Sequence, residues 1–240
     1  RVKFVSVTNG DAGHQNMGGG HLAKIRRKEA QEAAKRLGIE EYTVLDNHDG
    51  ELLPTLNVRH QLIRQIRDWD ADIVLSPRPA DYHPDHRYTG ILVQDAAYLV
   101  IVPNVTPDTP PLEKNPVFLY LEDHFQKPYP FQPDITVDIT NTYEKKIAGL
   151  DAHESQMYEW LPWTGGKLDE VPKNKEDRIK FLRQNWGGNI TPEERKNLIK
   201  WYGKEHGENV KYAESFEVCE YGKQPSEEEI KQLFPMLDHK

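Results

Sequence analysis

Strand and helix patterns alternate along the first 100 residues of this chain of 240. Short apolar runs with the period of a strand are followed by longer stretches in which apolar residues recur at every third or fourth position. Such alternation predicts parallel strands joined by right-handed crossover helices, in a doubly wound, layered α/β fold. The predicted strands are residues 2–8, 42–45 and 72–76, and the predicted helices are residues 21–37, 56–69 and 86–100.

The alternation ends at Pro103, and the rest of the chain is less regular. The predicted organisation is a core domain of residues 1–156 and a C-terminal extension of residues 157–240, packed on the same domain. Aromatic residues of the extension, Trp160 and Trp163 among them, predict a lid that stacks on a sugar, a contact between copies of the chain, or rings buried against the sheet. The further predicted elements are strands at residues 117–121 and 135–139, an edge strand at residues 213–219, and helices at residues 143–156, 193–202 and 226–233.

Composition excludes several classes of function. The formal net charge of −8 argues against nucleic acid as a partner, because binding the phosphate backbone requires a basic face. No apolar stretch approaches the ~20 residues of a membrane-spanning helix, so we predict no transmembrane segment. The single cysteine, Cys219, excludes an internal disulfide framework, which favours the cytoplasm and leaves export open.

A dense group of polar side chains follows the apolar run 73–76. His83-Pro84-Asp85-His86 places two imidazoles and a carboxylate where a buried parallel strand ends, which is where open α/β sheets bind their ligands. Imidazole is a common zinc ligand, and a neighbouring carboxylate fixes its tautomer. The alternative is a solvated loop whose histidines cap the next helix. The addition of Arg78, Asp81 and Tyr82 to the same loop favours a functional site.

Parallel strands bring the loops at their carboxyl ends to one edge of the sheet, so we expect further polar loops to lie near this motif. A chance gathering is the alternative, because loops are generally rich in polar residues. The residues concerned are Asp11, His14, His48, Asp49, Glu122, Asp123 and His124.

Five motifs stand out in combination: His83-Pro84-Asp85-His86, Thr8-Asn9-Gly10-Asp11-Ala12-Gly13, Arg26-x-x-Glu29, Asp49-Gly50-x-Leu52 and His153-x-Ser155-Gln156. Together they resemble the PIG-L/LmbE family of zinc-dependent N-deacetylases. The resemblance covers most of residues 1–160 and, more weakly, residues 213–216. It implies a Rossmann-like fold, a three-layer sandwich with a mostly parallel sheet. The implied reaction removes the acetyl group from an N-acetylglucosamine-type amine and releases acetate.

The resemblance also implies roles for individual residues. His86 matches the family's metal-ligand histidine. His83 matches the catalytic histidine that, when protonated, stabilises the oxyanion of the tetrahedral intermediate, and Asp85 matches the carboxylate that orients it. Arg26 and Asp49 match positions that contact the sugar or its aglycone. The same loops supply the remaining candidates for substrate binding, which are Asp11, Arg78 and Tyr82.

One family feature is missing from the sequence. The other two zinc ligands and the general base of the family come from an Ala-His-Pro-Asp-Asp motif, which is absent from these 240 residues. A catalytic zinc ion takes three protein ligands, so His86 alone does not suffice. We expect a segment before Arg1 to carry the motif. The alternative is a relative in which His14, His48 or His124 substitutes.

The predicted function is therefore a Zn²⁺-dependent hydrolase of a small N-acetylated sugar or glycoconjugate. Hydrolysis of an amide by a metal-bound water needs a carboxylate base and a donor at the carbonyl oxygen, and His83 suits the second role. Two alternatives stay open. One is a non-catalytic carbohydrate-binding relative that has lost its metal, and the other is a zinc hydrolase that acts on a different amide.

Overall fold

The computed structural model describes residues 1–237, which fold into a mixed α/β protein, as the sequence predicts. The chain divides into two compact units. Unit 1 contains Arg1–Leu52 and Ile139–Asn189, and unit 2 contains Leu53–Asp138 and Ile190–Lys240. Each unit is thus built from two separate stretches of the sequence. The predicted division at residue 156 stays a prediction.

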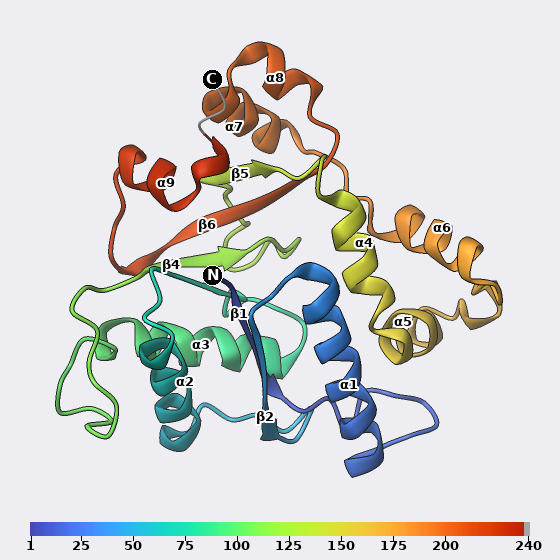
Figure 1. Cartoon of the computed structure of the whole chain (residues 1–240), viewed down its shortest axis with the longest axis horizontal. Helices are drawn as coiled ribbons and strands as arrows, with labels where there is room; N and C mark the ends of the chain where they lie inside the picture. The colour runs from blue at the N-terminus through green and yellow to red at the C-terminus, as the bar shows by residue number, and fades with distance from the viewer. Residues whose placement is uncertain (238–240) are drawn as a thin grey trace. The chain divides into compact units, whose positions relative to one another are not determined.

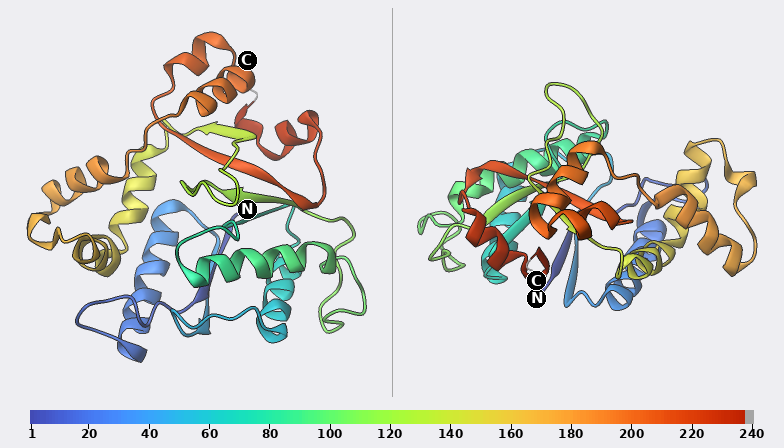
Figure 2. Two further views of the ribbon diagram at one scale, coloured as in Figure 1. Left: turned by 180° about the vertical axis from the view of Figure 1, so that it is seen from behind. Right: turned by 90° about the horizontal axis from the view of Figure 1, so that it is seen from above.

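Unit 1 is built around one parallel strand pair. Strand β1 (Lys3–Thr8) pairs with β2 (Glu41–Asn47), and helix α1 (Gly19–Leu37) connects them. Gly38 ends α1 in a left-handed conformation, with φ at 77°, and donates its N–H to the carbonyl of Ala34. Helix α1 lies against α4 (Tyr143–Asp151), which comes from the second stretch of this unit (Figures 1 and 2). These elements confirm the predicted strand–helix–strand order.

The predicted helix over residues 143–156 is wrong in its second half. Helix α4 ends at Asp151, and Ser155–Trp160 then forms a π-helix. The regular hydrogen-bond ladder is interrupted because the amide of Ser155 donates to the carboxylate of Glu29 at 2.7 Å. Unit 1 continues with α5 (Leu161–Thr164), a short 3₁₀ turn (Leu168–Glu170) and α6 (Lys175–Trp186). Helix α6 was not predicted, although Asn174 caps it by accepting the N–H of Asp177 at 2.9 Å.

Unit 2 contains a four-stranded sheet with the order β3-β4-β6-β5. Strand β3 (Ile73–Ser76) is parallel to β4 (Val117–Leu121), whereas β6 (Ala213–Gly222) runs antiparallel to β4 and to β5 (Ile135–Asp138). The predicted edge strand at residues 213–219 is therefore an interior strand (Figure 1). Ser215 of β6 is buried, and its hydroxyl group is satisfied by hydrogen bonds. The hydroxyl lies 2.9 Å from that of Thr136 and donates to Glu194 at 2.7 Å.

Helices α2 (Leu56–Asp68) and α3 (Pro84–Leu99) lie against each other in unit 2. Helix α3 approaches the loop after β3 so closely that a Cβ on Gly90 would lie 2.7 Å from the carbonyl oxygen of Pro77. Only glycine fits there, and the loop is held firmly against the helix. The remaining helices of unit 2 are α7 (Pro192–Tyr202), α8 (Lys204–Asn209), α9 (Glu227–Leu233) and the 3₁₀ turn Pro235–Leu237. No helix within residues 1–237 has the length and apolar character needed to cross a membrane.

Candidate active site

The loop between β3 and α3 in unit 2 carries the His83-Pro84-Asp85-His86 motif. His83 is the N-cap of α3, Pro84 occupies the first turn, and the ring of His83 accepts the amide N–H of Asp85 at 3.2 Å. The rings of His83 and His86 lie 4.8 Å apart between centroids. The motif thus starts the helix and places two imidazoles side by side.

The capping bond constrains the proton on His83. Its Nδ1 accepts a hydrogen bond from the Asp85 amide, so in this arrangement the proton of a neutral ring is on Nε2. This bond leaves Nε2 as the donor atom of the His83 ring. The protonated ring that the resemblance implies stays a prediction. Asp85 contacts the ring of His83 through its backbone amide. The side chain of Asp85 is buried, at 3% exposure. Orientation of His83 by the Asp85 carboxylate stays a prediction.

Asp81, which the sequence analysis counted in this loop without assigning it a role, organises the loop. One carboxylate oxygen, Oδ1, accepts the backbone N–H of His83 at 2.8 Å and lies 3.1 Å from Nδ1 of His86. A carboxylate on Nδ1 favours the tautomer that leaves Nε2 of His86 as a lone-pair ligand. The spacing Asp-x-His, typical of a turn closed by an aspartate side chain, was the signal in the sequence.

Tyr82 is the most exposed of the predicted site residues in this loop. Its side chain is 70% exposed, and its ring stands edge-on to His83 and His86, with centroids 5.8 and 5.7 Å away. A large exposed aromatic ring beside two imidazoles is suited to contact a ligand. Its predicted role in substrate binding stays a prediction.

Arg78, a predicted substrate contact, is buried in an ion pair; its contact with substrate stays a prediction. It is 1% exposed and binds Asp123 through two bonds, Nε to Oδ2 at 2.7 Å and Nη2 to Oδ1 at 2.6 Å. It also donates to the carbonyls of Phe125 and Tyr129. The hydrogen bonds and the charge of Asp123 raise the pKa of Arg78 despite its burial. This pair confirms that the loops after β3 and β4 meet.

Asp11 similarly joins the loops after β1 and β2 in unit 1. Its carboxylate lies 2.7 Å from Nδ1 of His48 and accepts the amide of Asp49 at 3.0 Å. Burial opposes its ionisation, but these bonds lower the pKa of Asp11 overall. Asp11 is 6% exposed and supports the loop that contains His48 and Asp49. Its predicted contact with substrate stays a prediction.

Arg26 and Asp49 both lie close to Gly13 in unit 1. A Cβ on Gly13 would lie 3.3 Å from Oδ2 of Asp49 and 3.8 Å from Nη2 of Arg26. Arg26 donates to the Gly13 carbonyl at 2.6 Å and to the side chain of Gln156, while its buried Nε has no hydrogen-bond partner in the described part of the chain. The His153-x-Ser155-Gln156 motif thus has a positioning role, since Gln156 holds Arg26.

The described residues do not by themselves fit a catalytic zinc ion. Residues 1–237 contain no group of three His, Cys, Asp or Glu side chains that could hold a metal. His14 is a poor substitute ligand because its ring accepts the amide of Asn16 and lies 2.6 Å from the carboxylate of Glu159. His86 with Asp81 supplies one suitable imidazole, and a zinc site requires three protein ligands.

Comparison with known proteins identifies the relatives of this chain. Residues 1–97 match the family described as PIG-L, GlcNAc-PI de-N-acetylase. A diacetylchitobiose deacetylase from Thermococcus kodakarensis is 31% identical over 173 residues, which cover 68% of this chain and 62% of that relative's length. The chain thus spans less than two thirds of that relative.

Solved structures show the same fold. The N,N'-diacetylchitobiose deacetylase of Pyrococcus horikoshii, in complex with an inhibitor, aligns with a TM-score of 0.64 at 26% identity, over 91% of this chain and 73% of that one. The 4-carboxy-2-hydroxymuconate hydratase GalB of Pseudomonas putida aligns with a TM-score of 0.62 at 21% identity, over 93% and 84% of the two chains. The second likeness concerns the fold alone, and a fold does not specify a reaction.

Replacing Arg78 by lysine tests its structural role. Arg78→Lys keeps the charge but loses the paired bonds to Asp123, so we expect a loss of about 3 kcal/mol of stability, measured by urea unfolding. The control is Arg64→Lys, because Arg64 binds Asp108 through the same two atoms at 2.7 and 3.0 Å on the surface. This exposed pair is expected to contribute less than ~1 kcal/mol. Equal losses in the two variants would contradict the structural role of Arg78.

The His48–Asp11 pair predicts a measurable titration. The hydrogen bond and charge of Asp11 raise the pKa of His48, so NMR should find it above 6.5 and closer to that value in Asp11→Asn. Because its folded-state pKa is raised, the contribution of His48 to the free energy of unfolding is full below its unfolded-state pKa. That contribution is lost as pH rises through the folded-state pKa. The Asp11 contribution is present above its unfolded pKa and is lost as pH falls through the lowered value. An unchanged His48 titration in Asp11→Asn would rule out the coupling.

Proposed function

Since the chain belongs to the PIG-L family of de-N-acetylases, we propose that it removes the acetyl group from an N-acetylglucosamine-type sugar and releases acetate. The observation that carries the proposal is the pair of imidazoles before α3, which have different hydrogen-bond partners on Nδ1. His83 accepts a backbone amide there, and His86 meets the carboxylate of Asp81. Their Nε2 atoms are consequently suited to different tasks, donation for His83 and ligation for His86.

In the proposed reaction, the oxygen of a water molecule attacks the acetyl carbonyl carbon, the carbon–nitrogen bond breaks, and acetate and a free amine result. Negative charge develops on the carbonyl oxygen in the tetrahedral intermediate, and a fixed donor aimed at this oxygen lowers the barrier. His83 supplies that donor through Nε2–H. Its position is preorganised because the ring is held by the first turn of α3 and its backbone by Asp81.

Sugar binding is assigned to unit 1. Asp49 accepts hydrogen bonds from hydroxyl groups, and Arg26 has a buried Nε donor that no described residue accepts. A site with such an unpaired donor discriminates strongly in favour of ligands that supply an acceptor. Tyr82, whose exposed ring stands edge-on to His83 and His86, is likewise proposed to contact substrate.

Zinc dependence is part of the proposal, with His86 as one ligand. When bound, such an ion activates water and polarises the acetyl carbonyl. Because the described residues hold no group of three ligands, the other ligands are not assigned.

Two substitutions of His83 separate its catalytic role from its capping role. His83→Asn keeps a good N-cap residue and removes the imidazole, whereas His83→Ala removes both. We expect acetate release from N,N'-diacetylchitobiose to fall about 100-fold or more in kcat for both variants. Only His83→Ala should also lose about 1 kcal/mol of stability. If His83→Asn retained full turnover, the histidine would be a cap and not a donor.

Metal analysis of the full-length protein tests the zinc proposal. We expect bound zinc in the wild type and its loss in His86→Ala, while Asp81→Asn should weaken zinc binding by about 10-fold to 100-fold, because Asp81 fixes the ring of His86. Wild-type protein that releases acetate without zinc would refute zinc dependence and leave the deacetylase proposal intact. Binding of the sugar without acetate release would favour a non-catalytic carbohydrate-binding protein.

A further inference from the structure

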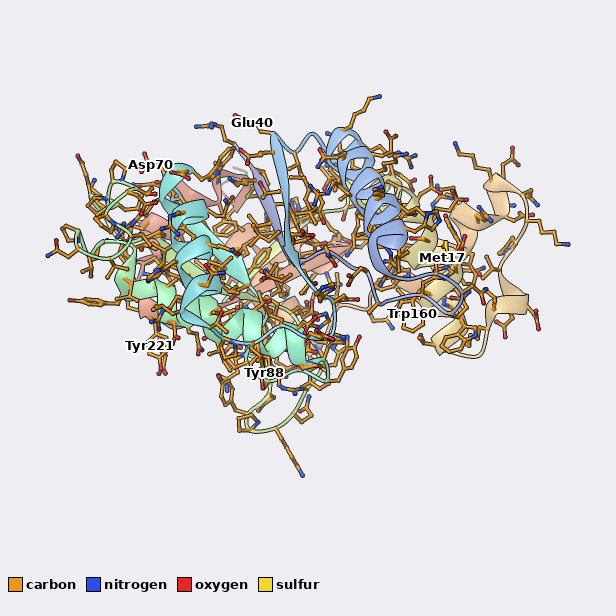
Figure 3. The ribbon with its side chains drawn as sticks, turned by 90° about the horizontal axis from the view of Figure 1, so that it is seen from below. Met17, Glu40, Asp70, Tyr88, Trp160 and Tyr221 are labelled. Atoms are coloured by element: carbon orange, nitrogen blue, oxygen red, sulfur yellow. The ribbon has the colours of Figure 1, made fainter. Side chains whose placement is uncertain are left out.

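The ring of Tyr82 has an aromatic partner from a different loop of unit 2. Phe125 belongs to the loop between β4 and β5, residues 122–134, and its ring centroid lies 6.3 Å from that of Tyr82, with 39° between the planes. Aromatic rings at such separations attract each other. In Figure 3, Tyr88 marks the first turns of α3, and the loop that carries Phe125 projects beside this end of the helix. Phe125 is half-buried and Tyr82 is 70% exposed, so Phe125 is the inner member of the pair.

The backbone of Phe125 is anchored by the buried ion pair of Arg78 and Asp123. Its amide donates to Oδ1 of Asp123 at 2.9 Å, and its carbonyl accepts from Nη2 of Arg78 at 3.1 Å. Arg78 and Asp123 are themselves joined by two hydrogen bonds, with the Arg78 side chain fully buried. Both polar groups of the Phe125 backbone are therefore tied to one rigid pair, which fixes the point from which the Phe125 ring extends.

The backbone of Tyr82 is held by other bonds. Arg87, in the first turn of α3, donates Nη1 to the carbonyl of Tyr82 at 3.0 Å. This bond positions the backbone and leaves the direction of the Tyr82 ring to contacts of the ring itself. The ring stands edge-on to His83 and His86 and is tilted against Phe125. Phe125 is thus a partner that holds the Tyr82 ring from outside the imidazole motif.

We propose that Phe125 is a positioning residue for the deacetylation reaction, and that it acts by holding the Tyr82 ring beside the two imidazoles. The inference rests on the proposed function, in which Tyr82 contacts substrate. Without Phe125, the exposed Tyr82 ring samples several rotamers, and fixing one of them on binding costs side-chain entropy. Substrate binding is then weaker, so KM rises. The turnover number kcat depends on the separately fixed His83 and changes little.

The position of the Tyr82 ring can be measured without substrate. An aromatic ring shifts the NMR resonances of nearby protons, and the Tyr82 centroid lies 5.8 and 5.7 Å from those of His83 and His86. At a fixed pH, Tyr82→Ala shows which part of each histidine shift comes from the Tyr82 ring. We expect Phe125→Ala to move both imidazole resonances toward their positions in Tyr82→Ala, because a ring that samples several rotamers shifts them less.

A double-mutant cycle tests whether Phe125 acts through Tyr82. The variants are Phe125→Ala, Tyr82→Ala and the two together, with acetate release from N,N'-diacetylchitobiose measured on the full-length protein. We expect Phe125→Ala to raise KM about threefold to tenfold, the size of one lost aromatic pair, with kcat nearly unchanged. In the Tyr82→Ala protein the same substitution should have no further effect. Phe125→Tyr keeps the ring and should retain the wild-type KM.

The matched control is Phe131→Ala. Phe131 is half-buried in the same loop, and its ring centroid lies 5.9 Å from Cζ of Arg78. Within residues 1–237 it forms no ring pair with Tyr82. Phe131→Ala therefore reports a general loosening of the loop, and we expect it to leave KM and the histidine resonances unchanged.

Several results would overturn the inference. They are an unchanged KM in Phe125→Ala or in Tyr82→Ala, an equal rise of KM in Phe131→Ala, and the same rise of KM from Phe125→Ala whether or not Tyr82 is present. Urea unfolding of Phe125→Ala and Phe131→Ala shows whether the two variants lose the same stability, so that a rise of KM confined to Phe125→Ala is assigned to the Tyr82 ring.

The two proposals can fail separately. If the wild type releases no acetate but Phe125→Ala moves the histidine resonances toward those of Tyr82→Ala, Phe125 positions Tyr82 and the deacetylase proposal is wrong. If acetate release is normal and Phe125→Ala changes neither KM nor the resonances, the deacetylase proposal stands and the positioning role of Phe125 is wrong.

Discussion

The paired bond between Arg78 and Asp123 is the interaction on which the arrangement of unit 2 depends. A guanidinium with its side chain fully buried is stable only if its N–H groups find acceptors, and here a carboxylate and two loop carbonyls provide them. The bond fixes the loop after β3 relative to the loop after β4. Helix α3 presses on the same loop at Gly90. Both constraints fix the segment that carries Asp81, His83 and His86, so the two imidazoles are held by a rigid part of the backbone.

Unit 1 uses the same principle with different groups. The carboxylate of Asp11 joins the loops after β1 and β2. The π-helix contacts the loop before α1 through Glu159, and it contacts α1 itself through Gln156. In both units, buried polar side chains therefore hold loops in place, and other residues of the same loops remain exposed. Exposure separates these two groups: Asp11 and Arg78 are almost fully buried, and Tyr82 is largely exposed.

Much of the fold could be predicted because it depends on local pattern. The first three strands, α1 and α2 follow from apolar periodicity and from end signals such as Gly38 and Thr55. The edge position predicted for β6 was wrong because strand order depends on pairing with distant strands, and β6 pairs with both β4 and β5. The hydroxyl of Ser215 in this strand likewise finds its partners, Thr136 and Glu194, at distant positions in the sequence. The π-helix was missed for a similar reason, since Glu29 on α1 takes the amide of Ser155.

The sequence by itself determined the strand–helix order of the first 100 residues, the His83-Pro84-Asp85-His86 motif at a helix start, and the resemblance to N-deacetylases. Residue types and short spacings suffice for these, because they reflect local backbone preferences and motif chemistry. Only the tertiary structure decided which polar residues support loops and which remain accessible. That division depends on burial and on partners far away in the chain, such as Asp123 for Arg78 and Gln156 for Arg26. Local sequence carries no information about either.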